Sequence, residues 1–209
     1  MLPDMSDKNA NIESAAEKAL EDEELLSELL DGLTSKKETL KYNCFKVLML
    51  ISKEHGELLY PKWDYFVGLL SADNTYWKLS ALQIIANLTK VDTENRFETI
   101  FDKYYELLDD KSVIPAAYVA GNSGKIARAK PRLQTRITNR LLGIDKTHRD
   151  PQRKDLVKGY AIEAFSEYFE EASNKKEIME FVEKQLESDS PKTRKTAKEF
   201  LKKWERSSY

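Results

Sequence analysis

The sequence predicts an all-α protein built from about five stacked helix pairs. Its 209 residues include only 7 glycines and 6 prolines, fewer than the turns of a β-sandwich or barrel would need. Apolar residues recur at intervals of three and four along most of the chain, which is the spacing of an amphipathic helix. A small residue also returns about every 36 residues, so we expect the helices to form an array.

Capping signals and prolines place the helix boundaries. Ser35 and Asn174 each stand three residues before a glutamate, the spacing of a capping box in which both side chains bond free backbone N–H groups. Asp150 and Ser190 each precede a proline, whose missing N–H is harmless at the first position of a helix. The predicted helices span residues 12–33, 37–54, 61–71, 74–90, 93–109, 111–129, 131–143, 151–172, 174–187 and 191–206.

We expect residues 1–11 to form a mobile N-terminal tail and residues 12–209 to form a single domain. Residues 1–11 are polar and lack helical periodicity, whereas the apolar pattern begins at Ile12. A chain of 209 residues has the length of one domain or of a short repeat array.

The second helix of each predicted pair aligns on one small residue. Successive copies of that residue are separated by 37, 36, 44 and 36 positions. Unrelated amphipathic helices share a period of about 3.6 residues but not one of about 36, so the longer period indicates a repeated unit. The aligned small residues are Cys44, Ala81, Ala117, Ala161 and Ala197.

Two copies carry the fullest version of the repeated motif. Segments 73–81 and 189–197 each begin with an aspartate in the turn and end with the small residue, which follows Lys78 or Arg194 by three positions. This order resembles the HEAT family over about residues 25–206. The resemblance implies a right-handed α-α superhelix, a HEAT-like solenoid in which each helix pair packs on its neighbours.

Three copies depart from the motif. The first copy has Lys36 in place of the turn aspartate, and the third has Ile114 in place of the basic residue. The fourth copy carries extra residues around 145–154. We therefore expect a ladder of aspartate and basic side chains to be interrupted at these repeats.

Composition argues against several classes of function. The 34 basic and 36 acidic residues nearly cancel, so bulk charge favours neither nucleic acid nor a membrane surface. The longest uninterrupted apolar run, 47–51, is far shorter than the ~20 residues that span a bilayer, and the acidic start is unlike a signal peptide. A single cysteine permits neither an internal disulfide nor a CxxC zinc site. We expect a cytoplasmic protein that binds no membrane.

We find no motif for catalysis, a cofactor or a metal ion, and we predict a non-enzymatic protein. The segment 121–126 has two glycines and a lysine but lacks the spacing and the hydroxyl of a GxxxxGK(S/T) phosphate loop, so we expect its glycines to let two helices approach. His55 and His148 belong to no metal or nucleophile motif and are expected at the surface. Cys44 occupies the small-residue position and is expected to be a core thiol.

Charge segregation is the most informative functional feature of the sequence. Residues 125–158 hold eleven basic and three acidic residues, a local balance of +8, whereas residues 1–33 have a balance of −8. The basic segment is therefore the candidate site for an acidic partner.

Three arginines in this segment are spaced by four residues. We expect Arg132, Arg136 and Arg140 to form one stripe on the helix 131–143, with Arg128 just across the turn. A partner-binding surface and a solvated face are both compatible with such a stripe. The candidate partner-binding residues are Lys125, Arg128, Arg132, Arg136, Arg140, His148, Arg149, Arg153, Lys154 and Lys158.

We predict a protein–protein interaction module that docks an acidic protein surface or segment on these residues. The alternative is nucleic-acid binding, in which the basic segment 125–158 neutralises phosphates. Self-assembly through a terminal repeat is a third alternative, because the ends of a helical array are exposed stacking surfaces.

The insert 144–154 is the favoured loop for function, and its alternative role is a longer connection between helices.

Overall fold

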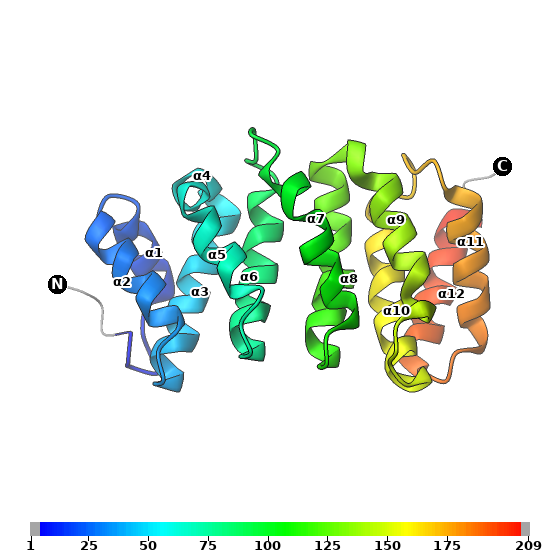
Figure 1. Cartoon of the computed structure of the whole chain (residues 1–209), viewed down its shortest axis with the longest axis horizontal. Helices are drawn as coiled ribbons and strands as arrows, with labels where there is room; N and C mark the ends of the chain where they lie inside the picture. The colour runs from blue at the N-terminus through cyan, green and yellow to red at the C-terminus, as the bar shows by residue number, and fades with distance from the viewer. Residues whose placement is uncertain (1–4, 206–209) are drawn as a thin grey trace. The chain divides into compact units, whose positions relative to one another are not determined.

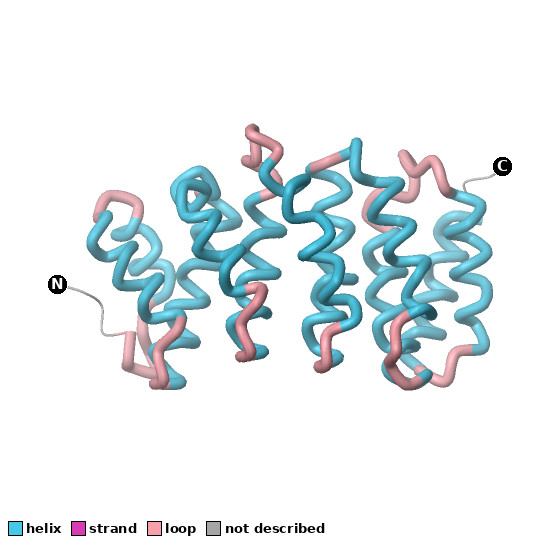
Figure 2. The backbone as a smooth tube through the Cα atoms, in the orientation of Figure 1, coloured by secondary structure: helices cyan, strands magenta, loops and turns pink. Residues whose placement is uncertain are grey.

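The computed structural model describes residues 5–205, and every regular element in that range is helical, which confirms the all-α prediction. The chain divides into two compact units, one ending at Glu94 and the other beginning at Asn95. The helices of the first unit are α1 (Ile12–Ala19), α2 (Glu23–Leu33), α3 (Glu38–Glu54), α4 (Gly56–Leu59), η1 (Tyr60–Lys62), α5 (Trp63–Leu69) and α6 (Thr75–Leu88) (Figures 1 and 2). Those of the second unit are α7 (Arg96–Glu106), η2 (Leu107–Asp109), α8 (Val113–Ala129), η3 (Pro131–Leu133), α9 (Gln134–Leu142), η4 (Gly143–Lys146), α10 (Pro151–Phe165), α11 (Lys175–Lys184), η5 (Gln185–Glu187) and α12 (Pro191–Glu205).

The first unit begins with a segment that packs against α3. Met5 is buried, and Asn43 Nδ2 donates hydrogen bonds to the backbone carbonyls of Met5 at 3.0 Å and Asp7 at 2.8 Å. These contacts involve part of the segment predicted as a mobile tail, whose residues 1–4 lie outside the described residues.

The prediction of one helix over residues 12–33 is wrong. The chain turns at residues 20–22, and the Asp22 carboxylate accepts a hydrogen bond from the Leu25 N–H at 2.9 Å. An aspartate in an extended conformation at this position caps a new helix, α2, and Glu23 and Glu24 then favour its first turn. The acidic run therefore starts a second helix instead of covering one face of a long one.

All five copies of the repeated small residue are buried, and none exposes more than 8% of its surface. Each lies within the second helix of its pair, namely α3, α6, α8, α10 or α12. In the first unit α3 packs against α6, and in the second unit α10 packs against both α8 and α12. The predicted core positions of the repeat are therefore confirmed.

Side-chain hydrogen bonds join residues that are about one repeat apart. In the first unit Asn87 Nδ2 donates to Ser52 Oγ, 35 residues earlier, at 2.7 Å. In the second unit the Thr193 hydroxyl donates to the backbone carbonyl of Asp155, 38 residues earlier, at 2.7 Å. Neighbouring helix pairs within each unit are thus bonded to one another.

The first helices of the second unit form their own row. Figure 1 shows α9 and α11 in front of α10 and α12, and α9 contacts both α8 and α11. Helix α7 contributes the buried rings of Phe97, Phe101, Tyr104 and Tyr105, and the Tyr105 hydroxyl lies 3.0 Å from Ser123 Oγ of α8. This buried aromatic face anchors α7 and leaves its polar residues at the surface.

Helices α8 and α10 approach closely at Gly124. A Cβ atom at this position would lie 2.8 Å from the backbone oxygen of Ala164 and 2.7 Å from the carboxylate of Glu167, so a larger residue does not fit. At Gly121, one turn earlier, a Cβ atom would make an ordinary contact of 3.6 Å with the Tyr160 ring. The predicted role of the glycines in helix approach is therefore confirmed at Gly124.

Gly124→Ala is expected to lower the free energy of unfolding by about 1–3 kcal/mol, because its methyl group overlaps the α10 backbone. Gly121→Ala is the matched control, since it adds the same methyl group to the same helix without a clash. Its free energy of unfolding should rise by about 0.5–1 kcal/mol, because alanine has lower backbone entropy than glycine in the unfolded chain. Urea unfolding followed by circular dichroism measures both variants. A Gly124→Ala protein as stable as the wild type would contradict the close approach.

Cys44 is a buried core thiol, as predicted. Its residue is 1% exposed, and burial raises the pKa of the thiol from 9.0 to about 11, although a backbone hydrogen bond opposes the rise. The thiol is therefore protonated at neutral pH and is a poor nucleophile.

Iodoacetamide at about pH 8 is expected to modify Cys44 at least about 100-fold more slowly in the native protein than in urea, because the pKa rise alone lowers the thiolate fraction by about that factor. Mass spectrometry of samples quenched over time gives both rates. Similar rates in the two states would mean that Cys44 is accessible in the folded chain.

Candidate functional site

The candidate basic residues lie in the second unit, between the last turns of α8 and the middle of α10. The structure separates them into groups with different partners. Two arginines on α9, Arg136 and Arg140, contact one carboxylate. Lys125 and Arg128, near the end of α8, lie beside Glu167. The other five lie in the insert 144–154 or beside it, namely His148, Arg149, Arg153, Lys154 and Lys158. Arg132 is exposed on η3.

Arg136 and Arg140 lie one turn apart on α9 and converge on Asp102 of α7; we call these two residues the arginine cluster. Arg136 Nη2 lies 3.6 Å from Asp102 Oδ1, and Arg140 donates a hydrogen bond to the same oxygen. The Arg136 guanidinium also stacks on the buried ring of Phe101, 3.9 Å from its centroid. Stacking and ion pairing both hold a guanidinium group in place.

The arginine cluster keeps a positive charge at the surface. The side chains of Arg136 and Arg140 remain 50% and 43% exposed. Two guanidinium groups share the single carboxylate of Asp102, so one positive charge is unneutralised within the cluster. A second carboxylate could bind there with little rearrangement.

The three arginines of the predicted stripe are divided between a 3₁₀ turn and an α-helix. Helix α9 begins at Gln134, so Arg132 lies before it on the 3₁₀ helix η3. Pro131 starts that short helix, which occupies the first part of the predicted helix 131–143. The α-helical stripe therefore consists of Arg136 and Arg140.

Lys125 and Arg128 lie beside Glu167, which follows α10. Arg128 Nη1 is 3.6 Å from Glu167 Oε2. Burial raises the pKa of the Glu167 carboxyl, and the positive charges of Arg128 and Lys125 oppose the rise without cancelling it. Arg128 thus has an acidic neighbour that lies outside its own segment of the sequence.

The insert is fixed to η2 by His148 and Arg149. His148 Nδ1 lies 2.6 Å from Asp109 Oδ2, and its backbone N–H donates to Asp109 Oδ1 at 3.1 Å. The Arg149 guanidinium donates two hydrogen bonds to the Leu108 carbonyl, at 3.2 and 2.9 Å. Burial lowers the pKa of Arg149, although nearby carboxylates oppose this effect. These contacts favour the connecting role of the insert.

Three further basic residues hold the start of α10. Arg153 Nε lies 3.3 Å from Asp150, the residue that caps this helix. Lys154 Nζ donates to the backbone carbonyl of Asp145 at 2.9 Å. Lys158 is only 8% exposed, and its Nζ lies 2.7 Å from Asp145 Oδ1. These three side chains make ion pairs or hydrogen bonds within the second unit.

Asp155 links α10 to the start of α12. Its Oδ2 accepts hydrogen bonds from the Ser188 hydroxyl at 2.6 Å and the Asp189 N–H at 2.9 Å, and its Oδ1 lies 3.4 Å from Lys158 Nζ. Burial alone would raise the pKa of the Asp155 carboxyl. The hydrogen bonds and the Lys158 ammonium outweigh burial and place this pKa below its ordinary value of 3.8.

Asp155→Asn is expected to lower the free energy of unfolding by about 1–3 kcal/mol near pH 7, because it weakens hydrogen bonds to a charged acceptor. A carboxyl group with a lowered pKa stabilises the fold above its unfolded-state pKa and loses that contribution as the pH falls through its folded value. The difference between variant and wild type should therefore shrink below about pH 4. Urea titrations at several pH values test this, and a difference that does not change with pH would refute the role of the charge.

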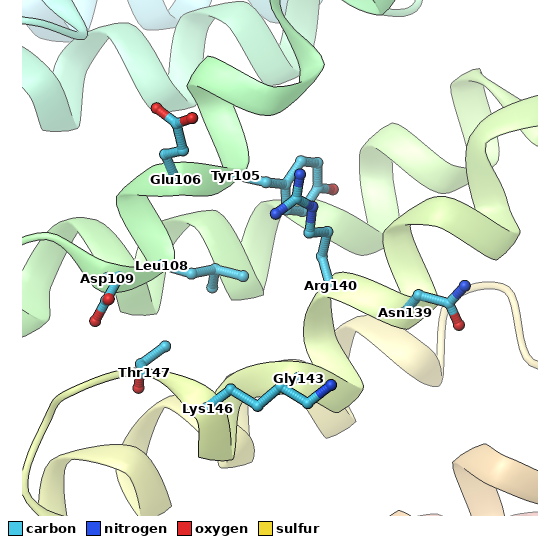
Figure 3. A pocket seen from close by; sticks show the side chains of 9 residues that line it. All are labelled: Tyr105, Glu106, Leu108, Asp109, Asn139, Arg140, Gly143, Lys146 and Thr147. Carbon is cyan, nitrogen blue, oxygen red and sulfur yellow. The ribbon is translucent and has the colours of Figure 1, made fainter.

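A pocket of about 420 Å³ adjoins the arginine cluster (Figure 3). Tyr105 and Leu108 give it an apolar side, Arg140 and Lys146 contribute positive charge, and Glu106 and Asp109 contribute negative charge. Figure 3 shows the carboxylate of Glu106 directed away from the side chains of Arg140 and Lys146. The pocket therefore combines an apolar side with charges of both signs beside the arginine cluster.

The acidic partners of the basic segment lie in other parts of the sequence and are not evident from the charge of the segment alone. Asp102 precedes Arg140 by 38 residues, and Asp109 precedes His148 by 39 residues. These separations match one repeat, so the repeat itself is the signal that could have paired them. Counting charges along the chain overlooks such partners, because they belong to the neighbouring helix pair.

Other candidate chemistry is not supported by the geometry. The segment 121–126 lies inside α8, where Ser123 and Gly124 are buried. Within residues 5–205 no group of three or more His, Cys, Asp or Glu side chains is placed to hold a metal ion. Among the helices of the described chain, none has the length and apolar character that a bilayer span requires.

Comparison with known proteins finds no family model that matches the chain and no curated protein that is significantly similar to it. The function is therefore inferred from the arrangement of side chains in the two units.

Proposed function

We propose that the chain is a non-enzymatic binding module, a HEAT-like solenoid that docks an acidic segment of a partner protein on the arginine cluster. The repeated buried positions and the hydrogen bonds between residues one repeat apart support the array. Arrays of this kind offer extended surfaces on which a partner segment can lie without entering a deep cavity.

The sharing of one carboxylate by two half-exposed arginines is the observation that carries this proposal. Because Phe101 and Asp102 already position Arg136, little side-chain entropy would be lost when a partner carboxylate binds. The adjoining pocket adds an apolar wall beside the cluster, which suits an apolar side chain next to the acidic one of the partner.

A protein partner fits this surface better than nucleic acid does. Phosphate tracking requires several uncompensated positive charges in a row. Here Asp102 lies between the two arginines, and Glu106 and Asp109 line the adjoining pocket. Arg149 and Lys158, which the linear count assigns to the basic segment, make internal contacts instead.

Replacing both arginines of the cluster is expected to abolish partner binding without unfolding the chain. In a pulldown from native lysate at low salt, Arg136→Gln with Arg140→Gln should lose an acidic protein that the wild type retains. Loss of two charge-assisted contacts corresponds to at least about a 10-fold weaker affinity. Circular dichroism checks that the variant remains helical.

The matched control is Lys176→Gln with Lys195→Gln, which removes the same charge from exposed positions of α11 and α12. It should retain the partner. Retention by the arginine variant would refute docking on the cluster. A steep salt-dependent gel shift of duplex or single-stranded nucleic acid, lost in the arginine variant, would favour the nucleic-acid alternative instead.

A further inference from the structure

Helices α1 and α3 of the first unit form a cavity of about 160 Å³. The two helices pack against each other (Figure 1). One face of α1 lines the cavity from Glu13 to Leu20, and α3 lines it over its last turn. We call this cavity the α1–α3 groove.

The groove has an apolar floor and a rim of carboxylates. Ile51 is buried in the floor, and Leu20 and Leu50 beside it are half-buried. The rim consists of three exposed glutamates, Glu13 and Glu17 of α1 and Glu54 of α3. Apolar surface and negative charge therefore lie within one concave site.

The carboxylates of the rim have no cationic partner in the fold. Within residues 5–205, neither Glu13, Glu17 nor Glu54 forms an ion pair. Their neighbours in the sequence, Lys18 and Lys53, do not line the groove. The lining thus has an excess of negative charge that remains available to a ligand.

Two of these carboxylates also stand where a helix disfavours them. Glu17 lies in the last turn of α1, and Glu54 is the last residue of α3. The partial negative charge at the C-terminus of a helix opposes a carboxylate there and adds to the negative potential of the groove. His55 also lines the groove, but its Nδ1 has a carboxylate neighbour of its own, Glu57 Oε1 at 3.8 Å.

We infer that the α1–α3 groove binds a lysine or arginine side chain from a basic segment of a partner protein. Such a side chain combines an apolar stem with a cationic head. The stem matches the apolar floor, and the head matches the carboxylates of the rim. A cavity of roughly 150 Å³ holds a group the size of benzene, so the groove has room for one side chain.

This inference goes beyond the proposed function. The groove lies in the first unit, uses neither Arg136 nor Arg140, and takes a ligand of the opposite charge. The two sites can therefore be tested independently.

A phage-displayed library of random peptides of about 10 residues provides the probe, because an extended segment of this length can present one side chain to a cavity. Selection on the wild-type chain is expected to enrich peptides that contain lysine or arginine. Fluorescence anisotropy of an enriched peptide should show at least about 10-fold weaker binding to Glu17→Gln with Glu54→Gln, since two charge-assisted contacts are lost.

The stability of this groove variant separates loss of the site from loss of the fold. Both replacements remove a carboxylate from the C-terminal end of a helix, where its charge is unfavourable. In urea the variant should therefore unfold at the same or a higher concentration than the wild type, while its affinity for the peptide falls.

Glu24→Gln with Glu28→Gln is the matched control, because it removes the same charge from exposed positions of α2 that do not line the groove. It should leave the affinity unchanged, and so should Arg136→Gln with Arg140→Gln. Equal binding of the peptide to the wild type and the groove variant would overturn the inference, as would enrichment of peptides without lysine or arginine. Sedimentation that shows self-association of the wild type and its loss in the groove variant would also overturn it, by assigning the groove to a second copy of the chain.

Discussion

The second unit depends on the close packing of α10 between α8 and α12. Small residues make this packing possible at both contacts. Gly124 faces the backbone of Ala164 on one side, and a Cβ atom at Gly159 would lie 2.6 Å from the Thr193 hydroxyl on the other. Because protein interiors are filled to crystal-like density, a larger residue at Gly124 would clash with the α10 backbone, and one at Gly159 would displace the Thr193 hydroxyl. The positions of the surface side chains on all three helices follow from this spacing.

Electrostatic contacts between neighbouring helix pairs then fix the loops. Asp109 holds the insert through His148, and Asp155 holds the turn before α12 through Ser188 and the Asp189 N–H. Each carboxylate reaches residues of the next pair. Such a contact orders few additional backbone residues, because the helices that it joins are already folded. Hydrogen bonds to a charged carboxylate are also stronger than those between neutral groups.

These internal contacts decide which charges remain available to a partner. A basic segment with a local balance of +8 becomes, in the folded unit, a set of buried or paired side chains, the exposed arginine cluster, and exposed Arg132 and Lys146. On the α8 row, burial of the small residues has the opposite effect, since it turns Ile114 and Tyr118 outward. The second unit thus exposes the arginine cluster on α9 and two apolar side chains on α8.

The all-α class, most helix boundaries, the five buried small residues and the core thiol of Cys44 could be predicted from the sequence, because these depend on local periodicity and caps. The prediction failed at residues 20–22, where a cap outweighs continued periodicity, and at residues 166–172, because α10 ends at Phe165. The pairing of charges, in contrast, follows from the packing of the helices. Asp102 and Arg140 are 38 residues apart in the chain and meet because neighbouring helix pairs stack, a contact that no linear window of charge contains.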